Sequence, residues 1–458
     1  MITTGFLASL LLFLFIGVAS LKASRGTSED YLVAGKNTPA WLVGLSAVAT
    51  NNSGFMFIGM IGLTYQSGLS SIWLMFGWIL GDLTVSLITA PGIRGISRSD
   101  QVHSFGGLLT HNDGANGALL RRLIGLLTIL FLTLYAAAQL KAGAKATSEL
   151  LGWSAATGPL VGALIVLIYS ASGGLRASIW TDAAQSFVMI AGMAGLVVAG
   201  VEGAGGAEAA LDAMGKVDPH YMDWFPPGGI YSSVLFIAGW FFGGFVVVGQ
   251  PHVLVRLVSM DPSASLARMR MVYYGWFTAF YGATIMVGML SRITLKTGDG
   301  FDSELALPRM ALMLLPEWMT GLVLAALFAA TLSTADSLIL SCSAALTRDI
   351  GIGRSLAWAK ISTAMVLLAA TIIALGADQS VFALVLDAWG LLGSAFAPLV
   401  VVKARGWRCT PAQALSMVVG GVAVFIIWNW LGLSSVAYAP LAGVATGFSI
   451  YMISGRMR

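Results

Sequence analysis

Apolar stretches, each close to 20 residues long and joined by short polar connectors, recur along the whole chain. A helix of about 20 apolar residues crosses the hydrocarbon core of a bilayer, so each stretch predicts a transmembrane helix. A β-barrel would instead show alternating segments of about ten residues. The pattern therefore predicts an all-α membrane protein with one polytopic domain over residues 1–458. Its thirteen candidate spans begin near residues 4, 40, 70, 121, 157, 177, 229, 271, 306, 357, 380, 412 and 436.

Composition supports this assignment. The chain is 57% hydrophobic and only 10% charged, which excludes an ordinary soluble protein of 458 residues. The first span has no basic region before it and no clear cleavage site, so we expect a helix there rather than a signal peptide. No concentrated basic tract indicates a nucleic-acid partner. Cys342 falls in a span and Cys409 in a loop, so we expect no disulfide framework.

The loops predict the orientation of the chain. Thirteen spans place the two termini on opposite sides, and most of the 25 Lys and Arg residues fall in one alternating set of loops. That set is expected in the cytoplasm. The connector 202–228 carries five acidic residues and a single lysine, Lys216, as expected of an outside loop. We therefore predict a multi-pass protein of the cell (inner) membrane with its N-terminus outside and its C-terminus in the cytoplasm.

The segment AATLSTADSLIL, residues 329–340, places several oxygen-bearing side chains inside a predicted span. At about 100° per residue, the side chains of Ser333, Thr334, Asp336 and Ser337 share one side of a helix. An Asp at the centre of a bilayer costs roughly 2.5–3.5 kcal/mol, so it should face an ion path, a water-filled cavity or a partner. Oxygen ligands suit a hard cation. The alternative is structural: hydroxyls that bond to carbonyls one turn earlier, and an Asp336 that pairs with a neighbouring helix.

Two predicted spans contain residues that interrupt a helix. Asn51, Asn52, Ser53 and Gly54 lie in the middle of one, and the other has the pair Gly243-Gly244 followed by Gly249-Gln250-Pro251. Interrupted helices at corresponding positions are typical of transporters built from inverted repeats. The interruptions predict a five-plus-five arrangement with one helix before it and two after it. The segments are 1–39 (leading helix and loop), 40–201 (first repeat), 229–402 (second repeat) and 403–458 (two trailing helices).

Four motifs in order along the chain carry a family resemblance. They are TNNSG with FIGMIG in the first interrupted span, GGLRASIWTDAAQ at 173–185, GQPHVLVR at 249–256 and STADSLILSCSAALTRDI at 333–350. With these motifs, the chain resembles the sodium:solute symporter family, and within it the sodium/proline symporter branch. The resemblance covers nearly the whole chain. It implies a LeuT-type core in which sodium lies between the first and eighth core helices.

The resemblance also implies specific sodium ligands. The main site would use the backbone carbonyls of Ala49, Asn52 and Ala330 with the hydroxyls of Ser333 and Thr334. Some members of the family hold a second sodium with an acid on the fifth core helix. That position corresponds to Asp182, with Ser333, Asp336 and Ser337 as its partners. The alternative for Asp182 is a structural acid at a helix N-terminus.

Candidate solute contacts follow from two patterns. Tyr135 and Gln139 are four residues apart, so they form one polar edge of a helix. Aromatic and Met side chains near the interruptions can line an apolar pocket, or serve in packing alone. In the proline branch, an Asp stands where this chain has Asn51, a Trp where it has Phe55, and a Trp and a Tyr where it has Gly243 and Val247. The candidates are Asn51, Ser53, Phe55, Met56, Tyr135, Gln139, Trp240 and Phe241.

These observations predict a sodium-coupled symporter, with Na⁺ as the coupling ion and no enzymatic activity. We expect it to import a small organic solute by alternating access, either an amino acid such as proline or a small monocarboxylate. Two alternatives stay open. A proton-coupled carrier would titrate Asp182 or Asp336, and a membrane solute-sensing module would share the same fold. No motif of an intramembrane enzyme is present in the sequence. Gln250 and His252 are expected near the cytoplasmic end, in a gating or structural role.

Overall fold

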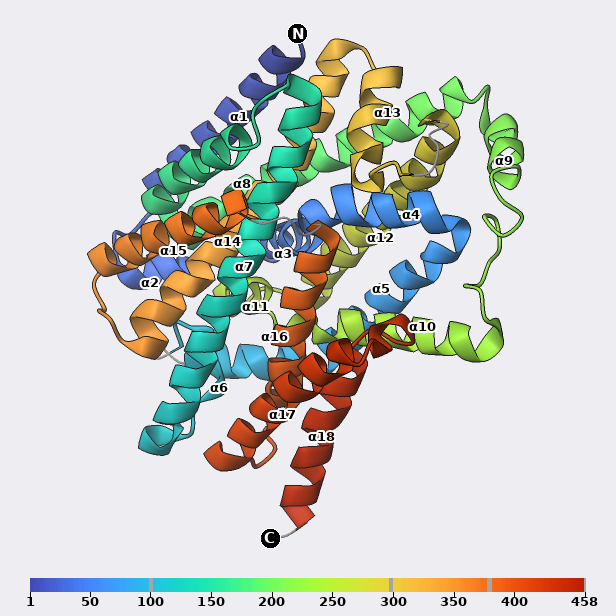
Figure 1. The fold of residues 1–458 in the computed structure, drawn as a ribbon. Coiled ribbons are helices and arrows are strands. Elements are labelled where there is room, and N and C mark those ends of the chain that lie inside the picture. The colour runs from blue at the N-terminus through green and yellow to red at the C-terminus, as the bar shows by residue number, and fades with distance from the viewer. Residues whose placement is uncertain (99–101, 296–299, 377–380, 457–458) are drawn as a thin grey trace.

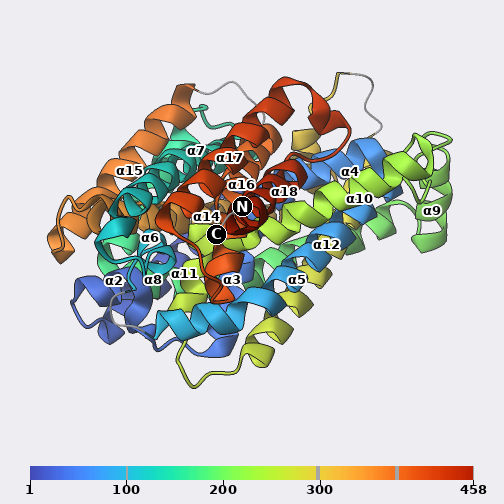
Figure 2. The same cartoon turned by 90° about the horizontal axis from the view of Figure 1, so that it is seen from below.

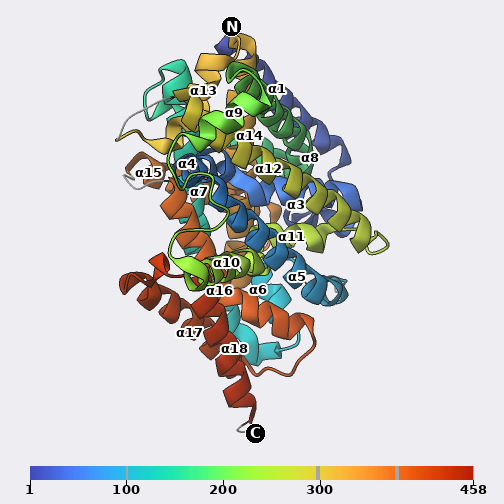
Figure 3. The ribbon, with the colours of Figure 1, turned by 90° about the vertical axis from the view of Figure 1, so that its right-hand side faces the viewer.

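The computed structural model describes residues 1–98, 102–295, 300–376 and 381–456. Helices form nearly all of this part of the chain, and its only β-type pairing is an isolated bridge between Thr38 and Met260. The N-terminus and the last described residues lie at opposite ends of the molecule (Figures 1 and 3). The α-helices are α1 (Ile2–Ala19), α2 (Ser28–Val33), α3 (Ala40–Gly54), α4 (Ile61–Ser67), α5 (Ile72–Ser97), α6 (Phe105–Leu109), α7 (Ala118–Leu151), α8 (Thr157–Gly203), α9 (Ala207–Gly215), α10 (Gly229–Phe245), α11 (Pro251–Ser259), α12 (Leu266–Leu295), α13 (Ala306–Leu314), α14 (Glu317–Ala344), α15 (Leu356–Gly376), α16 (Val381–Ala404), α17 (Pro411–Trp430) and α18 (Pro440–Arg456).

Short 3₁₀ or π-helical turns join or extend these helices. They are η1 (Ser20–Ala23), η2 (Ala34–Lys36), η3 (Phe55–Met60), η4 (Gly68–Ser71), η5 (Gly114–Gly117), η6 (Val246–Gly249), η7 (Ser303–Leu305), η8 (Ala345–Ile350) and η9 (Leu433–Ser435).

Within the described residues, nine helical segments are long and apolar enough to cross a membrane. Two of them are too long for one crossing: Ala40–Ser97 has 58 residues and Thr157–Gly203 has 47. The predicted count of thirteen spans therefore stays a prediction. The predicted span start near residue 380 lies outside the described residues, and α16 is described from Val381.

The 47-residue helix α8 folds back on itself at Gly174. Gly174 has φ +56° and ψ −141°, a conformation open to glycine and strained for other residues. Tyr169 and Thr181 flank this bend at a distance of twelve residues, yet both lie against the same glycine of α1, Gly17. The bend thus produces two antiparallel arms, where the apolar pattern predicts two spans that begin near 157 and 177. The 58-residue segment also turns, at Gly68 with φ +64°, before α5 begins.

The first interrupted helix breaks where the sequence predicts it. Ser53 has φ +48° and ψ −177°, which separates α3 from the π-helical turn η3 and from α4. The second interrupted helix continues through its glycine pair and breaks after it. Gly243 and Gly244 stay inside α10, and the interruption is formed by η6 and by Gln250, whose φ of −95° and ψ of 106° are extended. Pro251 then occupies the first turn of α11, where its missing N–H is not needed.

The predicted single span that begins near residue 306 is two helices. α13 ends at Leu314, and the extended Leu315 and Pro316 lead into α14, which begins at Glu317. Hydropathy alone missed this because α13 is itself apolar on one side. Pro316 marks the boundary, since the residue before a proline disfavours the helical conformation.

α14 is the centre of the bundle. It packs against α8, α7, α1 and α3, and 94% of its most apolar window is buried. Small residues such as Ala326, Ala329 and Ala330 allow the neighbouring helices to approach closely. α17 and α18 pack against each other and against α16 at the end of the molecule that holds the C-terminus (Figures 1 and 2). The polar face of α14 therefore lies deep inside the protein, next to the break in α3.

Candidate ion and solute site

The first part of the site joins the end of α3 to the middle of α14. The Ser333 hydroxyl lies 3.1 Å from the carbonyl oxygen of Ala330 and 3.5 Å from that of Ala49. One residue along, the Thr334 hydroxyl donates to the carbonyl of Thr50 at 3.0 Å. We call Ala49, Ala330, Ser333 and Thr334 the neutral group, because their oxygens belong to carbonyls and hydroxyls. The structure thus brings together four of the five residues predicted for the main sodium site.

Asn52, the fifth predicted residue, lies at the break itself. Its carbonyl accepts a hydrogen bond from the N–H of Phe55, and its side-chain amide donates to the carbonyl of Val48 at 2.9 Å. Its Oδ1 atom is buried and has no hydrogen-bond partner in the described part of the chain. The assignment of all five residues to sodium stays a prediction.

A second polar cluster lies next to the neutral group on α14. Asp182 of α8 accepts hydrogen bonds from the hydroxyls of Ser46, at 2.6 Å, and Thr50, at 3.4 Å. Asp336 accepts a short hydrogen bond from Ser170. The hydroxyl of Ser337 lies 3.2 Å from that of Thr50. The residues predicted for a second sodium therefore do lie close together.

The sequence analysis missed the residue at the centre of this second cluster, Arg256 of α11. Its guanidinium is fully buried and lies 3.1 Å from Asp182 Oδ2. It also donates to Ser46 at 3.1 Å, to Ser178 at 3.0 Å and, by a short contact, to Ser337. The available signal was an arginine in the middle of the apolar run 253–258. We call Asp182, Arg256, Asp336 and Ser337 the charged group.

Another buried arginine, Arg94 of α5, has a different environment. Its guanidinium donates to the carbonyls of Asp261, Pro262 and Ala264, at 2.6–2.7 Å, in the loop between α11 and α12. In that loop, hydrogen bonds from the hydroxyl and the N–H of Ser263 lower the pKa of the Asp261 carboxyl. Arg94 therefore anchors a loop and contacts neither group on α14.

The polar edge predicted on α7 meets the break in α3. The side-chain oxygen of Gln139 accepts the N–H of Gly54 at 2.8 Å, and Tyr135 forms a hydrogen bond with Ser53. Both Tyr135 and Gln139 are buried. Because the break frees the N–H of Gly54 from helical bonding, a side-chain acceptor on a neighbouring helix satisfies it.

Aromatic rings cover the other side of the break. Phe55 stacks on Phe382 of α16, with ring centroids 5.3 Å apart, and on Trp78 of α5 at 6.2 Å. Trp78 in turn contacts the predicted residue Trp240 at 5.9 Å, and Trp389 at 5.4 Å. Trp78, Phe382 and Trp389 were not predicted, since α5 and α16 reach the break only through packing. Together the five rings form an aromatic wall beside the interrupted helix.

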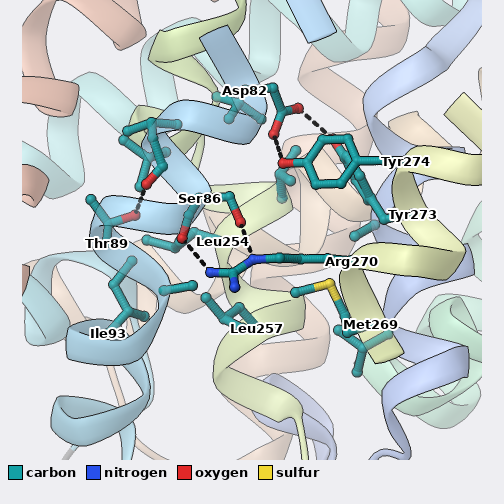
Figure 4. A pocket seen from close by; sticks show the side chains of 17 residues that line it. Asp82, Ser86, Thr89, Ile93, Leu254, Leu257, Met269, Arg270, Tyr273 and Tyr274 are labelled. Carbon is teal, nitrogen blue, oxygen red and sulfur yellow. Dashed lines mark hydrogen bonds between the residues drawn. The ribbon is translucent and has the colours of Figure 1, made fainter. Parts of the chain in front are cut away.

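Three predicted solute contacts differ from Tyr135 and Gln139: Asn51 and Phe241 contact residues away from the polar edge of α7, and Met56 is buried in η3. The side chain of Asn51 points to Tyr273 of α12, at 2.6 Å, and to Asp82 of α5, at 3.4 Å. Figure 4 shows Asp82 hydrogen-bonded to Tyr273 and Tyr274, which with it line a mostly apolar cavity of about 70 Å³. Phe241 is partly buried and packs against Phe242 and Phe245 of its own helix, and Met56 is buried in η3. These contacts favour structural roles for Asn51 and Phe241.

Unpaired polar atoms gather on the edge near α7. His252 is fully buried, its ring lies 5.7 Å from that of Tyr135 and 6.2 Å from that of Trp389, and neither ring nitrogen has a hydrogen-bond partner among the described residues. Gln139 Nε2 and Gln250 Oε1 are likewise buried without a partner in those residues. Buried polar atoms are nearly always paired, so unpaired ones indicate the place of a bound molecule or water. His252 is therefore a further candidate for the solute site, and its expected gating or structural role stays a prediction.

A polar cavity of about 390 Å³ lies beyond the aromatic wall. Lys145 of α7 bonds there to Asp302 at 2.9 Å and, by a shorter contact, to Glu304. Glu304 also accepts the N–H of Phe382 at 3.0 Å. An ion-pair cluster therefore fixes the start of α16, and with it the Phe382 ring that stacks on Phe55.

Comparison with known proteins identifies the family. The family model of the sodium:solute symporter family matches residues 31–421, which is most of the chain. The sodium/proline symporter of Salmonella typhimurium (strain LT2) is 26% identical, over 99% of this chain and 94% of that protein. The high-affinity proline transporter PutP of Bacillus subtilis (strain 168) is 27% identical, over 96% of this chain and 95% of that protein.

Solved structures show the same fold. A Na⁺-coupled sialic acid symporter in a substrate-bound outward-open state matches with a TM-score of 0.83 and 18% identity, over 100% of this chain and 97% of that chain. Mhp1, a nucleobase-cation-symport-1 family transporter in a closed conformation, matches with a TM-score of 0.56 and 15% identity, over 93% of this chain and 95% of that chain. The predicted fold class, an all-helical membrane protein of the LeuT type with two broken helices, is confirmed.

Proposed function

Because the chain belongs to the sodium:solute symporter family, a family of multi-pass membrane transporters rather than enzymes, we propose that it imports proline or a closely related small amino acid together with sodium. Proline is favoured because relatives that span nearly the same length are proline transporters. A small monocarboxylate is the second solute class, since the half-helix N-terminus at Pro251 favours a negative charge.

The unpaired buried atoms near α7 are the observation that carries this proposal. Gln139 Nε2 is a donor suited to a carboxylate, and the His252 nitrogens provide a donor and an acceptor beside it. The ring of Phe55 provides an apolar face suited to a pyrrolidine ring. We propose Tyr135, Gln139, His252 and Phe55 as the principal solute contacts.

The neutral group is proposed as the main sodium site, with the carbonyl of Asn52 as a further ligand. A sodium ion there would join α3 to α14, and thereby fix the break in α3 against the α7 edge. Sodium that binds first from the outside would organise the solute site, and separation of α3 from α14 would release it on the other side. One charge that crosses 100 mV provides about 2.3 kcal/mol. That free energy supports about 40-fold accumulation of a neutral solute.

We place the protein in the cell (inner) membrane, with the N-terminus and the Lys145–Glu304 cavity outside and the C-terminus in the cytoplasm. The proposal rests on the loop charges, since most Lys and Arg residues fall in one alternating set of loops and the acidic 202–228 connector belongs to the other set.

Uptake into proteoliposomes tests the function directly. Purified protein should accumulate labelled proline when sodium is imposed outside, and should not do so when potassium replaces it. Uptake driven by a pH gradient without sodium would replace this proposal with proton coupling. Sodium-driven uptake of a different solute from an amino-acid and monocarboxylate panel would keep the coupling and correct the substrate.

A further inference from the structure

Two carboxylates and one guanidinium are buried together in the charged group. Asp182, Asp336 and Arg256 are all fully buried, and they come from three different helices. Removing an ion from water costs several kcal/mol unless an opposite charge and hydrogen bonds compensate it. The guanidinium of Arg256 compensates Asp182 directly, at 3.1 Å. Through Ser178, which also bonds Asp336, it reaches the second carboxylate.

The donors of Arg256 point at the oxygens that a second cation would need. Three acceptors of the guanidinium are Asp182 Oδ2 and the hydroxyls of Ser337 and Ser46. A sodium ion in this place would need lone pairs from the same Asp182 and Ser337 oxygens. The guanidinium also donates to Ser178 and to the carbonyl of His252, at 2.5 Å, which belongs to its own helix and holds the side chain in position. The guanidinium and an ion would therefore compete for Asp182 Oδ2 and the Ser337 hydroxyl, whereas Asp182 Oδ1 and Asp336 Oδ2 are buried without a hydrogen-bond partner among the described residues.

We propose that Arg256 is a tethered cation that occupies the place of a second sodium ion, so that the transporter binds and moves one sodium per solute. This inference rests on the proposed sodium coupling and deepens it. Asp182 and Ser337 then serve to hold a permanent charge between α8, α11 and α14. The neutral group is left as the site where sodium exchanges.

Removing the tethered charge should create the second site. Arg256→Gln leaves two carboxylates with no buried cation, together with the hydroxyls of Ser46, Ser178 and Ser337. Equilibrium binding of ²²Na⁺ to purified protein should therefore give one sodium per wild-type molecule and two per Arg256→Gln molecule. In proteoliposomes, the Hill coefficient for sodium-dependent uptake should rise from about one toward two.

Two control variants separate charge from structure. Arg256→Lys keeps a tethered cation and should bind one sodium. Arg94→Gln removes a buried guanidinium that bonds only loop carbonyls, so it should also bind one sodium. Two sodium ions in Arg94→Gln would show that any lost arginine has this effect, and would overturn the inference.

Sodium binding to the wild-type protein tests the inference even if the Arg256→Gln variant does not fold. Two sodium ions bound to the wild-type protein would overturn the inference and leave the proposed function intact. No sodium bound would overturn both. A folded Arg256→Gln protein that still binds one sodium would overturn the inference alone.

Discussion

The neutral group and the charged group lie about one turn apart on α14, yet they balance charge in opposite ways. In the neutral group, the hydroxyls of Ser333 and Thr334 face backbone carbonyls of α3, with no formal charge. In the charged group, Asp182 and Arg256 bring ionised groups that compensate each other inside the protein. Both groups include hydroxyls of α14 and contact α3, but the charged group adds a carboxylate from α8 and a guanidinium from α11.

The difference in charge implies different roles: the neutral group suits an ion that binds and leaves, and the charged group suits a permanent ion pair. Dipoles of carbonyls and hydroxyls attract a small cation without a net charge to neutralise, so the ion can enter and leave with the conformation of the broken helix. A buried ion pair has no such freedom, because the loss of one partner leaves the other uncompensated. We therefore expect variants of the neutral group to change sodium affinity, and variants of the charged group that keep Arg256 to change mainly stability.

The largest effect should come from the bend that places the charged group. Gly174→Ala adds a Cβ 2.3 Å from the carbonyl oxygen of Tyr31, at a φ of +56°. The steric clash and the strained backbone should lower stability by about 3 kcal/mol or more. Thermal unfolding in detergent checks this. The matched control is Gly152→Ala, which has φ +66° but open space around the Cβ, and it should lose only about 1 kcal/mol.

The next largest effect should be on sodium affinity. Ser333→Ala with Thr334→Ala removes both hydroxyls of the neutral group, and each lost ligand costs about 1 kcal/mol or more. The sodium concentration for half-maximal uptake should rise by about tenfold to 100-fold. The control is Ser343→Ala, also on α14, whose hydroxyl bonds only the carbonyl of Ala359, at 2.7 Å. Normal sodium affinity in the double variant would remove the neutral group from the ion path.

A single hydroxyl deletion sharpens the comparison within one helix. Ser337→Ala removes one contact of Arg256 and should lower stability by about 1 kcal/mol, while the sodium concentration for half-maximal uptake changes less than threefold. Ser333→Ala should show the reverse. Sodium titration of uptake and thermal unfolding, measured on both variants, decide the assignment. If the two variants behave alike, the division into two groups is wrong.

The smallest effect concerns the Asp82 cluster, which lies outside both groups. Tyr274→Phe removes one hydrogen bond to Asp82, of 2.8 Å, and should cost about 0.5–1.5 kcal/mol of stability with unchanged sodium affinity. Tyr273 also bonds Asn51, next to the break in α3, so Tyr273→Phe should additionally slow uptake. Uptake rates of the two variants, compared at saturating sodium, measure the difference.

Structural features that depend on residues adjacent in sequence were predicted from the sequence. The break at Ser53 follows from consecutive residues that weaken a helix, and the shared face of Ser333, Thr334 and Ser337 follows from helical spacing. The bend at Gly174 matches the predicted pair of spans. Each of these depends on the order of residues within one or two turns.

Features set by packing were not predicted. Arg256 meets Asp182 only because α11 lies against α3 and α14, and no local pattern specifies that contact. His252 faces Tyr135 for the same reason. The pair Gly243-Gly244 was predicted to help break its helix. It instead lets α5 and Tyr438 approach, since a Cβ on Gly244 would lie 1.9 Å from the carbonyl oxygen of Trp78 and one on Gly243 would lie 3.0 Å from the Tyr438 ring.

The stacked rings of Phe55, Phe382 and Trp78 bear on how tightly transport is coupled. They separate the Lys145–Glu304 cavity from the break in α3, and the start of α16 is fixed by Glu304. An ion that escaped alone toward that cavity would dissipate the gradient without moving solute. Phe382 belongs to α16, whose start is fixed by Glu304, so we expect the rings to separate when α16 moves; until then an ion on this route meets apolar rings. We therefore expect the aromatic wall to oppose leakage of a lone ion toward this cavity, in addition to its proposed contact with the solute.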